Sequence, residues 1–122
     1  MYNYIQLDAA ELEFVAVAEE YELPPGERLF VTIDDAQIII FNLASMLYAI
    51  GDVCSHDGNL LDDAPVEGHE VVCPRHGARF DVRNGKVLAL PAVVDIPAYP
   101  VRVREKLIEV GVPKQKKIER YS

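Results

Sequence analysis

Two short segments contain both cysteines and two of the three histidines of this 122-residue chain. They are Cys54-Ser55-His56 and Cys73-Pro74-Arg75-His76, and sixteen residues separate His56 from Cys73. An extended backbone places residues two positions apart on the same side, so the first segment can offer a sulfur to one metal ion and a nitrogen to its neighbour. The second segment offers the same two donors. Two thiolates and two imidazoles in this arrangement predict a [2Fe–2S] cluster with one iron on sulfur and the other on nitrogen.

Two alternatives remain open for the same four residues. They could bind a single zinc ion, although paired ligands of zinc sites are usually separated by two to four residues. They could also comprise a Cys54–Cys73 disulfide and two idle histidines, which is unfavourable in a cytoplasmic chain. A zinc protein would be colourless, whereas an iron–sulfur protein would be brown.

The elements that must hold these segments are short strands and turns, with little helical periodicity. Apolar and β-branched residues predict strands at 14–18, 28–33, 37–42, 46–50, 70–72, 78–82, 86–88, 99–104 and 107–110. Tight turns are predicted at Asp34-Asp35, Asn84-Gly85 and Glu105-Lys106. The only helix candidate is a single turn at residues 8–14.

This pattern predicts an all-β protein, either a sandwich or a small barrel. We expect one domain over residues 5–112, in which the cluster-binding subdomain, approximately residues 53–91, is an insertion. Residues 113–122 are expected to form a polar basic tail, since they hold four basic residues and one acid.

The formal net charge is −8, and residues 1–112 carry 8 basic and 19 acidic side chains. Such an acidic body argues against nucleic acid as a partner, because phosphate repels it. It would suit docking on a basic protein surface, although plain solubility explains the charge equally well. The N-terminus lacks the features of a signal peptide, and the apolar runs at 38–41 and 46–50 are too short to span a bilayer. We therefore expect a soluble cytoplasmic protein without a membrane partner.

The order Cys-x-His, sixteen residues, Cys-x-x-His-Gly resembles the Rieske signature. Residues 73–87 resemble Rieske-type ferredoxins of bacterial oxygenase systems, and so does Pro91-Ala92 followed by Pro97, Tyr99 and Val101. The resemblance extends from about residue 14 to residue 110. It implies a β-sandwich base, a small inserted subdomain and one [2Fe–2S] cluster per chain. By the same resemblance, Cys54 and Cys73 would bind one iron, and His56 and His76 would bind the other at an exposed tip.

The resemblance further implies a one-electron carrier that is not itself a catalyst. A flavin-dependent reductase would reduce it, and an oxygenase or another redox acceptor protein would oxidise it. The chain is too short to hold the second iron domain of an oxygenase catalytic subunit. The alternative is a small Rieske subunit of a redox enzyme such as nitrite reductase, although such subunits often lack some of the ligands that are all present here.

Respiratory Rieske proteins resemble this motif but add a disulfide between the two loops, for which this chain has no spare cysteines. They also carry serine and tyrosine hydroxyls that donate to the cluster sulfurs, where this chain has Ala78 and Phe80. Fewer donors stabilise the reduced state less. The acidic Asp57, Asp62 and Asp63 in or near the first loop oppose added negative charge, and Arg75, Arg79 and Arg83 would partly compensate for them. We therefore predict a reduction potential at the low end of the class range, about −150 mV to zero.

Overall fold

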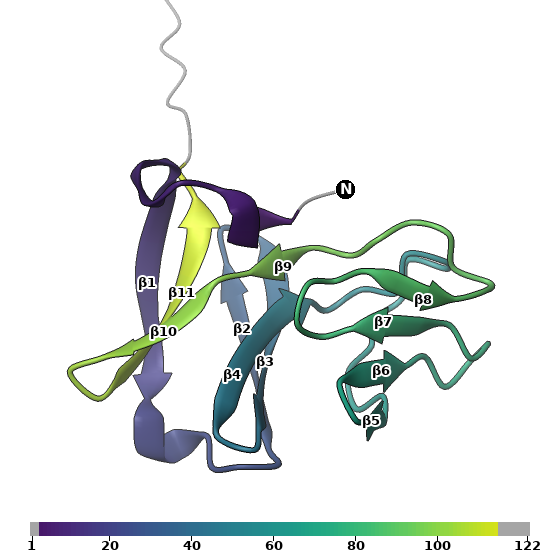
Figure 1. Ribbon diagram of the computed structural model, residues 1–122, viewed down its shortest axis with the longest axis horizontal. Coiled ribbons are helices and arrows are strands. Elements are labelled where there is room, and N and C mark those ends of the chain that lie inside the picture. The colour runs from purple at the N-terminus through teal and green to yellow at the C-terminus, as the bar shows by residue number, and fades with distance from the viewer. Residues whose placement is uncertain (1–2, 115–122) are drawn as a thin grey trace, which may run out of the picture.

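The computed structural model describes residues 3–114, which form three antiparallel sheets (Figure 1). The first sheet has the order β1-β11-β10, the second β2-β3-β4-β9 and the third β5-β6-β7-β8. The predicted all-β architecture is therefore confirmed. The predicted tail at 113–122 lies, from position 115 onward, outside the described residues.

The bounds of the strands are, in chain order, β1 (Leu12–Glu19), β2 (Arg28–Ile33), β3 (Ala36–Leu43), β4 (Met46–Gly51), β5 (Val66–Glu67), β6 (Glu70–Val72), β7 (Arg79–Asp81), β8 (Val87–Ala89), β9 (Ala98–Tyr99), β10 (Val101–Arg104) and β11 (Leu107–Pro113). The described part of the chain also has three 3₁₀ helices, at Tyr4–Gln6, Ala9–Glu11 and Glu20–Glu22. No helix among residues 3–114 is long and apolar enough to cross a membrane.

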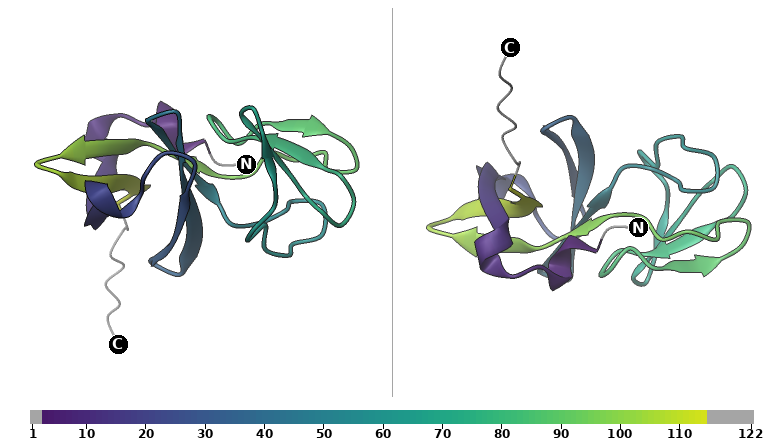
Figure 2. Two further views of the ribbon diagram at one scale, coloured as in Figure 1. Left: turned by 90° about the horizontal axis from the view of Figure 1, so that it is seen from below. Right: turned by 90° about the horizontal axis from the view of Figure 1, so that it is seen from above.

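The molecule is divided into two lobes, which are visible in Figure 1 and in both views of Figure 2. The base lobe contains the first two sheets. The small lobe, residues 52–97, contains the third sheet and leaves the base lobe after β4 and returns to it at β9. Both predicted ligand segments lie in the small lobe.

Strand β3 contributes apolar side chains to the cores of both lobes. Ile38 and Ile40 pack in the core between the first two sheets, together with Ile108 of β11. Ile39 and Phe41 belong to a second core, which includes the small lobe. Successive side chains of a strand point to opposite faces, so a continuous apolar run is required where both faces are buried.

Two of the three predicted tight turns are confirmed. Asp34-Asp35 and Glu105-Lys106 each join paired strands with two residues at positive φ, and Ala44-Ser45 makes the same turn between β3 and β4 without an obvious sequence signal. Two positive φ values give a two-residue turn the twist that matches antiparallel strands.

The predicted two-residue turn at Asn84-Gly85 is wrong, because residues 82–86 all lie between β7 and β8. Asp81 organises this wider connection. Its backbone carbonyl accepts a hydrogen bond from Gly85 N–H at 2.7 Å, and its carboxylate accepts from Arg83 N–H at 2.9 Å. The single helical turn predicted at 8–14 is present but shorter, since it is a 3₁₀ turn at Ala9–Glu11 and β1 begins at Leu12.

Candidate metal centre

The first ligand loop follows β4 and is closed by two backbone hydrogen bonds. Cys54 N–H donates to the carbonyl of Asn59 at 2.8 Å, and Gly58 N–H donates to the carbonyl of Cys54 at 2.7 Å. The buried carboxylate of Asp52 then accepts hydrogen bonds from the backbone N–H groups of Leu61 and Asp62 at 2.7 and 2.9 Å. These contacts hold both ends of a loop that has no regular secondary structure.

The second ligand loop joins β6 to β7 and repeats the same backbone frame. Cys73 N–H donates to the carbonyl of Ala78 at 2.8 Å, and Gly77 N–H donates to the carbonyl of Cys73 at 2.9 Å. The glycine of each frame has a positive φ, 74° at Gly58 and 79° at Gly77. A side chain would be strained in that conformation, so the backbone explains the glycine in each loop.

The two cysteine thiols are free and fully buried. Burial is the main cause that raises the pKa of the Cys54 thiol, the neighbouring Cys73 raises it further, and the backbone N–H groups of His56 and Asp57 act in the opposite direction. A buried thiolate needs a nearby cation. Bound iron would supply it, so the chemistry of these donors fits a metal cluster.

The two histidines lie on the outside of the same site. His56 and His76 are exposed, and their rings are 5.0 Å apart between centroids and nearly perpendicular, at 84°. The structure therefore brings the two sulfur donors together inside, within 4.8 Å of each other, and the two imidazoles together at the surface. That asymmetry matches a cluster with one iron on sulfur and one on nitrogen.

The third histidine does not join this group. His69 lies in the exposed turn between β5 and β6, and its ring contacts the edge of Tyr48 at 5.9 Å between centroids.

The site includes an ion pair that the sequence did not indicate. The Arg75 guanidinium contacts the Asp57 carboxylate, with 2.7 Å between Nε and Oδ2 and 3.3 Å between Nη2 and Oδ1. The hydrogen bonds from Arg75 are the main cause that holds the pKa of Asp57 well below its usual range, and the backbone N–H of Asn59 contributes. The sequence contains one feature that could have predicted this ion pair. When Cys54–Gly58 is aligned with Cys73–Gly77, the acidic Asp57 and the basic Arg75 fall at neighbouring positions of the two loops.

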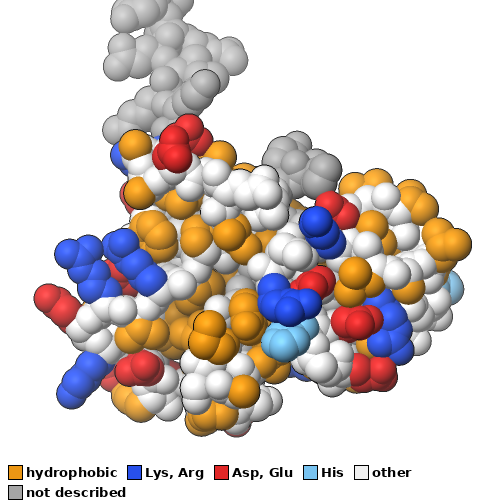
Figure 3. Space-filling model, in the orientation of Figure 1, with side chains coloured by type: hydrophobic (Ala, Val, Ile, Leu, Met, Phe, Trp, Pro, Cys, Tyr) orange, Lys and Arg blue, Asp and Glu red, His pale blue; other side chains and the backbone are white. Residues whose placement is uncertain are grey.

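A third segment, residues 90–96, lies beside the first ligand loop. The hydroxyl of Ser55 donates a hydrogen bond to the carbonyl of Val94. Ala92 is buried in the same core as both cysteines, whereas Leu90 and Val93 are 75% and 74% exposed. In Figure 3, hydrophobic side chains gather at the outer end of the small lobe.

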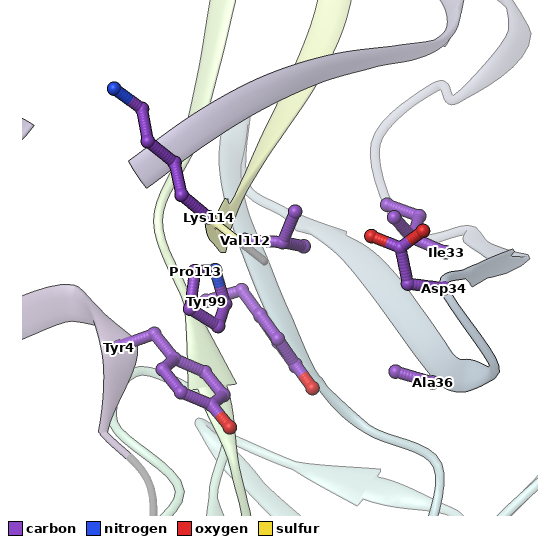
Figure 4. A pocket seen from close by; sticks show the side chains of 8 residues that line it. All are labelled: Tyr4, Ile33, Asp34, Ala36, Tyr99, Val112, Pro113 and Lys114. Carbon is purple, nitrogen blue, oxygen red and sulfur yellow. The ribbon is translucent and has the colours of Figure 1, made fainter. Parts of the chain in front are cut away.

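The pocket drawn in Figure 4 belongs to the base lobe and not to this site. It has a volume of about 230 Å³ and is lined by Tyr4, Ile33, Asp34, Ala36, Tyr99, Val112, Pro113 and Lys114. None of the four predicted ligands lines it.

The fold and the donor set together define an iron–sulfur electron-transfer domain. Comparison with known proteins identifies its family, because the Rieske [2Fe-2S] domain matches residues 13–100. The chain belongs to this family, whose cofactor is a [2Fe–2S] cluster, and the zinc and disulfide alternatives are set aside.

Three similar proteins indicate which members of the family this chain resembles. The 3-phenylpropionate/cinnamic acid dioxygenase ferredoxin subunit of Escherichia coli (strain K12) is 40% identical over 99 residues, which cover 75% of this chain and 87% of the relative. The ferredoxin of carbazole 1,9a-dioxygenase from Nocardioides aromaticivorans IC177 has a TM-score of 0.75 at 36% identity, with 83% of this chain and 98% of that chain covered. A structure from Mycobacterium tuberculosis, named as the small subunit of an NADH-dependent nitrite reductase, has a TM-score of 0.74 at 27% identity, with 85% and 98% covered.

Proposed function

We propose that this chain is a one-electron carrier that passes electrons from a flavin-dependent reductase to an oxygenase component in the cytoplasm. The observation that carries the proposal is the arrangement of the donors, with exposed imidazoles over buried thiols. An exposed nitrogen edge lets a partner approach the redox centre. Two of the similar proteins are named as ferredoxins of dioxygenase systems, which supports the choice of an oxygenase.

In this proposal Cys54 and Cys73 hold the inner iron, and His56 and His76 hold the outer iron. The bound cluster supplies a centre that accepts and releases one electron. Because two neutral imidazoles replace two thiolates, the centre carries less negative charge than one with four cysteines and is easier to reduce. The chain itself excludes water from the sulfur side and presents the nitrogen side to partners.

The segment that is hydrogen-bonded to Ser55, next to the ligand His56, has the character of a transient docking site. Leu90 and Val93 are the most exposed large aliphatic side chains of the segment that is tied to Ser55. An apolar centre with a polar rim is typical of specific protein interfaces. The acidic charge of the whole chain would steer encounter with a basic partner surface.

The second candidate is the small subunit of a nitrite reductase, supported by the similar fold of the M. tuberculosis structure. The two candidates differ in how firmly the chain binds its partner. A subunit copurifies as a stable large complex, whereas a ferredoxin leaves its partner after each transfer.

Spectroscopy of the purified protein tests the ligand set. Iron and sulfide analysis should give a [2Fe–2S] content of one per chain, and the EPR spectrum of the reduced protein should show the low average g value of mixed ligation. His56→Ala and His76→Ala should each abolish that spectrum. His69→Ala is the matched control, since His69 is also exposed but lies in neither loop. An unchanged spectrum in either loop variant would refute the ligand set.

Transfer kinetics test the role. The reduced wild-type protein should pass one electron to an oxygenase component and show no turnover of a small substrate by itself. Independent substrate turnover would contradict the carrier role, and a stable copurifying reductase subunit would favour the second candidate.

A further inference from the structure

The two ligand loops can be superposed position by position through their shared backbone frame. In each frame the cysteine bonds to the glycine four residues later and to the residue after that. The third position is His56 in one loop and Arg75 in the other, and the fourth position is Asp57 and His76. Each loop therefore devotes one of these two positions to an imidazole and the other to a charged residue.

The two charged residues meet across the loops. Both oxygens of Asp57 contact the Arg75 guanidinium, at 2.7 and 3.3 Å, and Oδ1 also accepts the N–H of Asn59 at 2.9 Å. The side chains are only 15% and 34% exposed, respectively. Two-point contacts between guanidinium and carboxylate fix geometry as well as charge.

We propose that Asp57 and Arg75 are positioning residues that form an ionic clasp between the two ligand loops. Apart from Cys54 and Cys73, which the donor set requires, the chain has no cysteine that could join the loops covalently. The clasp holds the loops at the separation that a shared cluster needs. This inference rests on the ligand set proposed above.

The same pair balances charge at the site. The Asp57 carboxylate and the sulfurs of Cys54 and Cys73 lie within 4.8 Å of one another, and Asp57 Oδ2 is 3.9 Å from His76 Nδ1. An unpaired carboxylate there would oppose an added electron, whereas an unpaired guanidinium would favour it. Arg75 cancels most of that field while the pair is intact.

The rate of cluster loss tests whether the clasp holds the two ligand loops in position. Asp57→Asn and Arg75→Gln in the cluster-loaded protein should each lose visible absorbance in an iron chelator about tenfold faster than wild type, the factor that corresponds to about 1.4 kcal/mol. The double variant should bleach no faster than the worse single variant, because each change alone already breaks the pair. The control is Glu67→Gln with Arg79→Gln, which removes the ion pairs of Arg79 with Glu67 at 3.0 Å and with Glu70 at 3.4 Å, neither of which joins the two ligand loops. Wild-type bleaching in the single variants, or rates that multiply in the double variant, would overturn the clasp.

Reduction potentials test the electrostatic role of the Asp57–Arg75 pair, because a purely structural role of the pair would leave the potential unchanged. Asp57→Asn should raise the potential, Arg75→Gln should lower it, and the double variant should return towards wild type. Arg75→Lys keeps the charge and loses the two-point contact, so it should retain the wild-type potential and bleach faster. Shifts of the same sign in both single variants would contradict the proposal. If wild type itself lacked the mixed-ligand spectrum, the ligand set would fail rather than the clasp.

Discussion

Ser55 of the first ligand loop donates its hydroxyl hydrogen bond to the backbone carbonyl of Val94. This contact joins segments that are 39 residues apart in the sequence. It connects the loop that holds Cys54 and His56 to the segment that carries the exposed Leu90 and Val93. The Ser55–Val94 hydrogen bond therefore links the first ligand loop to the proposed docking surface.

Ser55→Ala should loosen this segment without changing any ligand. The lost hydrogen bond is expected to cost about 1 kcal/mol of unfolding free energy, and the cluster should bleach faster in a chelator because its cover opens more often. Denaturant unfolding and the bleaching rate measure these effects. Ser45→Ala is the control, since Ser45 is exposed in the β3–β4 turn and only its backbone N–H is bonded. Equal behaviour of the two variants would mean that the Val94 contact does not hold the segment.

Two residues at the end of the second ligand loop and in β7 predict a low reduction potential. Ala78 and Phe80 are fully buried and carry no hydroxyl, so neither can donate to a cluster sulfur. The wild-type potential is expected at about −150 mV to zero, and a redox titration well above +150 mV would contradict it. Ala78→Ser adds a donor next to the second ligand loop and should raise the potential by on the order of 50 mV.

The matched control for that variant is Ala49→Ser, which buries the same hydroxyl in the core of the base lobe. It should cost a comparable amount of stability and leave the potential unchanged. Equal potential shifts in both variants would show that the serine acts through general destabilisation and not through the cluster sulfurs.

Local signals predicted most of what determines the site. The donor residues could be predicted from the spacing of Cys54-x-His56 and Cys73-x-x-His76, because both loops are short and their geometry depends on near neighbours. The turns at Asp34-Asp35 and Glu105-Lys106 were predictable for the same reason. The fold class followed from many short β-branched segments, and it is confirmed by the three sheets.

Contacts between distant segments could not be predicted in this way. The pair of Asp57 with Arg75 depends on how two loops face each other, whereas the sequence shows only two separate charges. The turn at Asn84-Gly85 was mispredicted because the Asp81 carboxylate binds the Arg83 backbone and guanidinium, which favours a wider connection. In both cases a side-chain interaction overrides or supplements the local backbone preference.

The exposed aliphatic residues of the segment that is hydrogen-bonded to Ser55 should matter for electron transfer to a partner and not for holding the cluster. Leu90→Gln and Val93→Gln each remove an apolar contact at the proposed docking surface, and a well-buried interface contact contributes about 1 kcal/mol. The KM for the ferredoxin in reduction of an oxygenase component should therefore rise about fivefold, with the reduction potential unchanged. Met46→Gln is the control, since Met46 is 59% exposed in the base lobe. An equal rise with Met46→Gln would place docking elsewhere.

Tyr99 should make the fold sensitive to alkaline pH. Its ring is buried in the base lobe against Tyr4, with 4.9 Å between centroids, and burial is the main cause that raises the pKa of Tyr99 to about 12. The unfolded chain has the ordinary value of about 10, so the folded state holds the phenol proton more tightly. The stability from this group is fully present below about pH 10 and is lost as the pH rises towards 12.

Tyr99→Phe removes the ionisable group and should flatten the fall of unfolding free energy across that pH window. Denaturant unfolding at a series of pH values measures the slope, and the slope reports the difference in bound protons between the unfolded and folded states. Tyr48→Phe is the control, because Tyr48 lies in β4 and is only half-buried. If Tyr99→Phe leaves the slope unchanged while Tyr48→Phe reduces it, the buried phenol at position 99 is not the group that couples folding to alkaline pH.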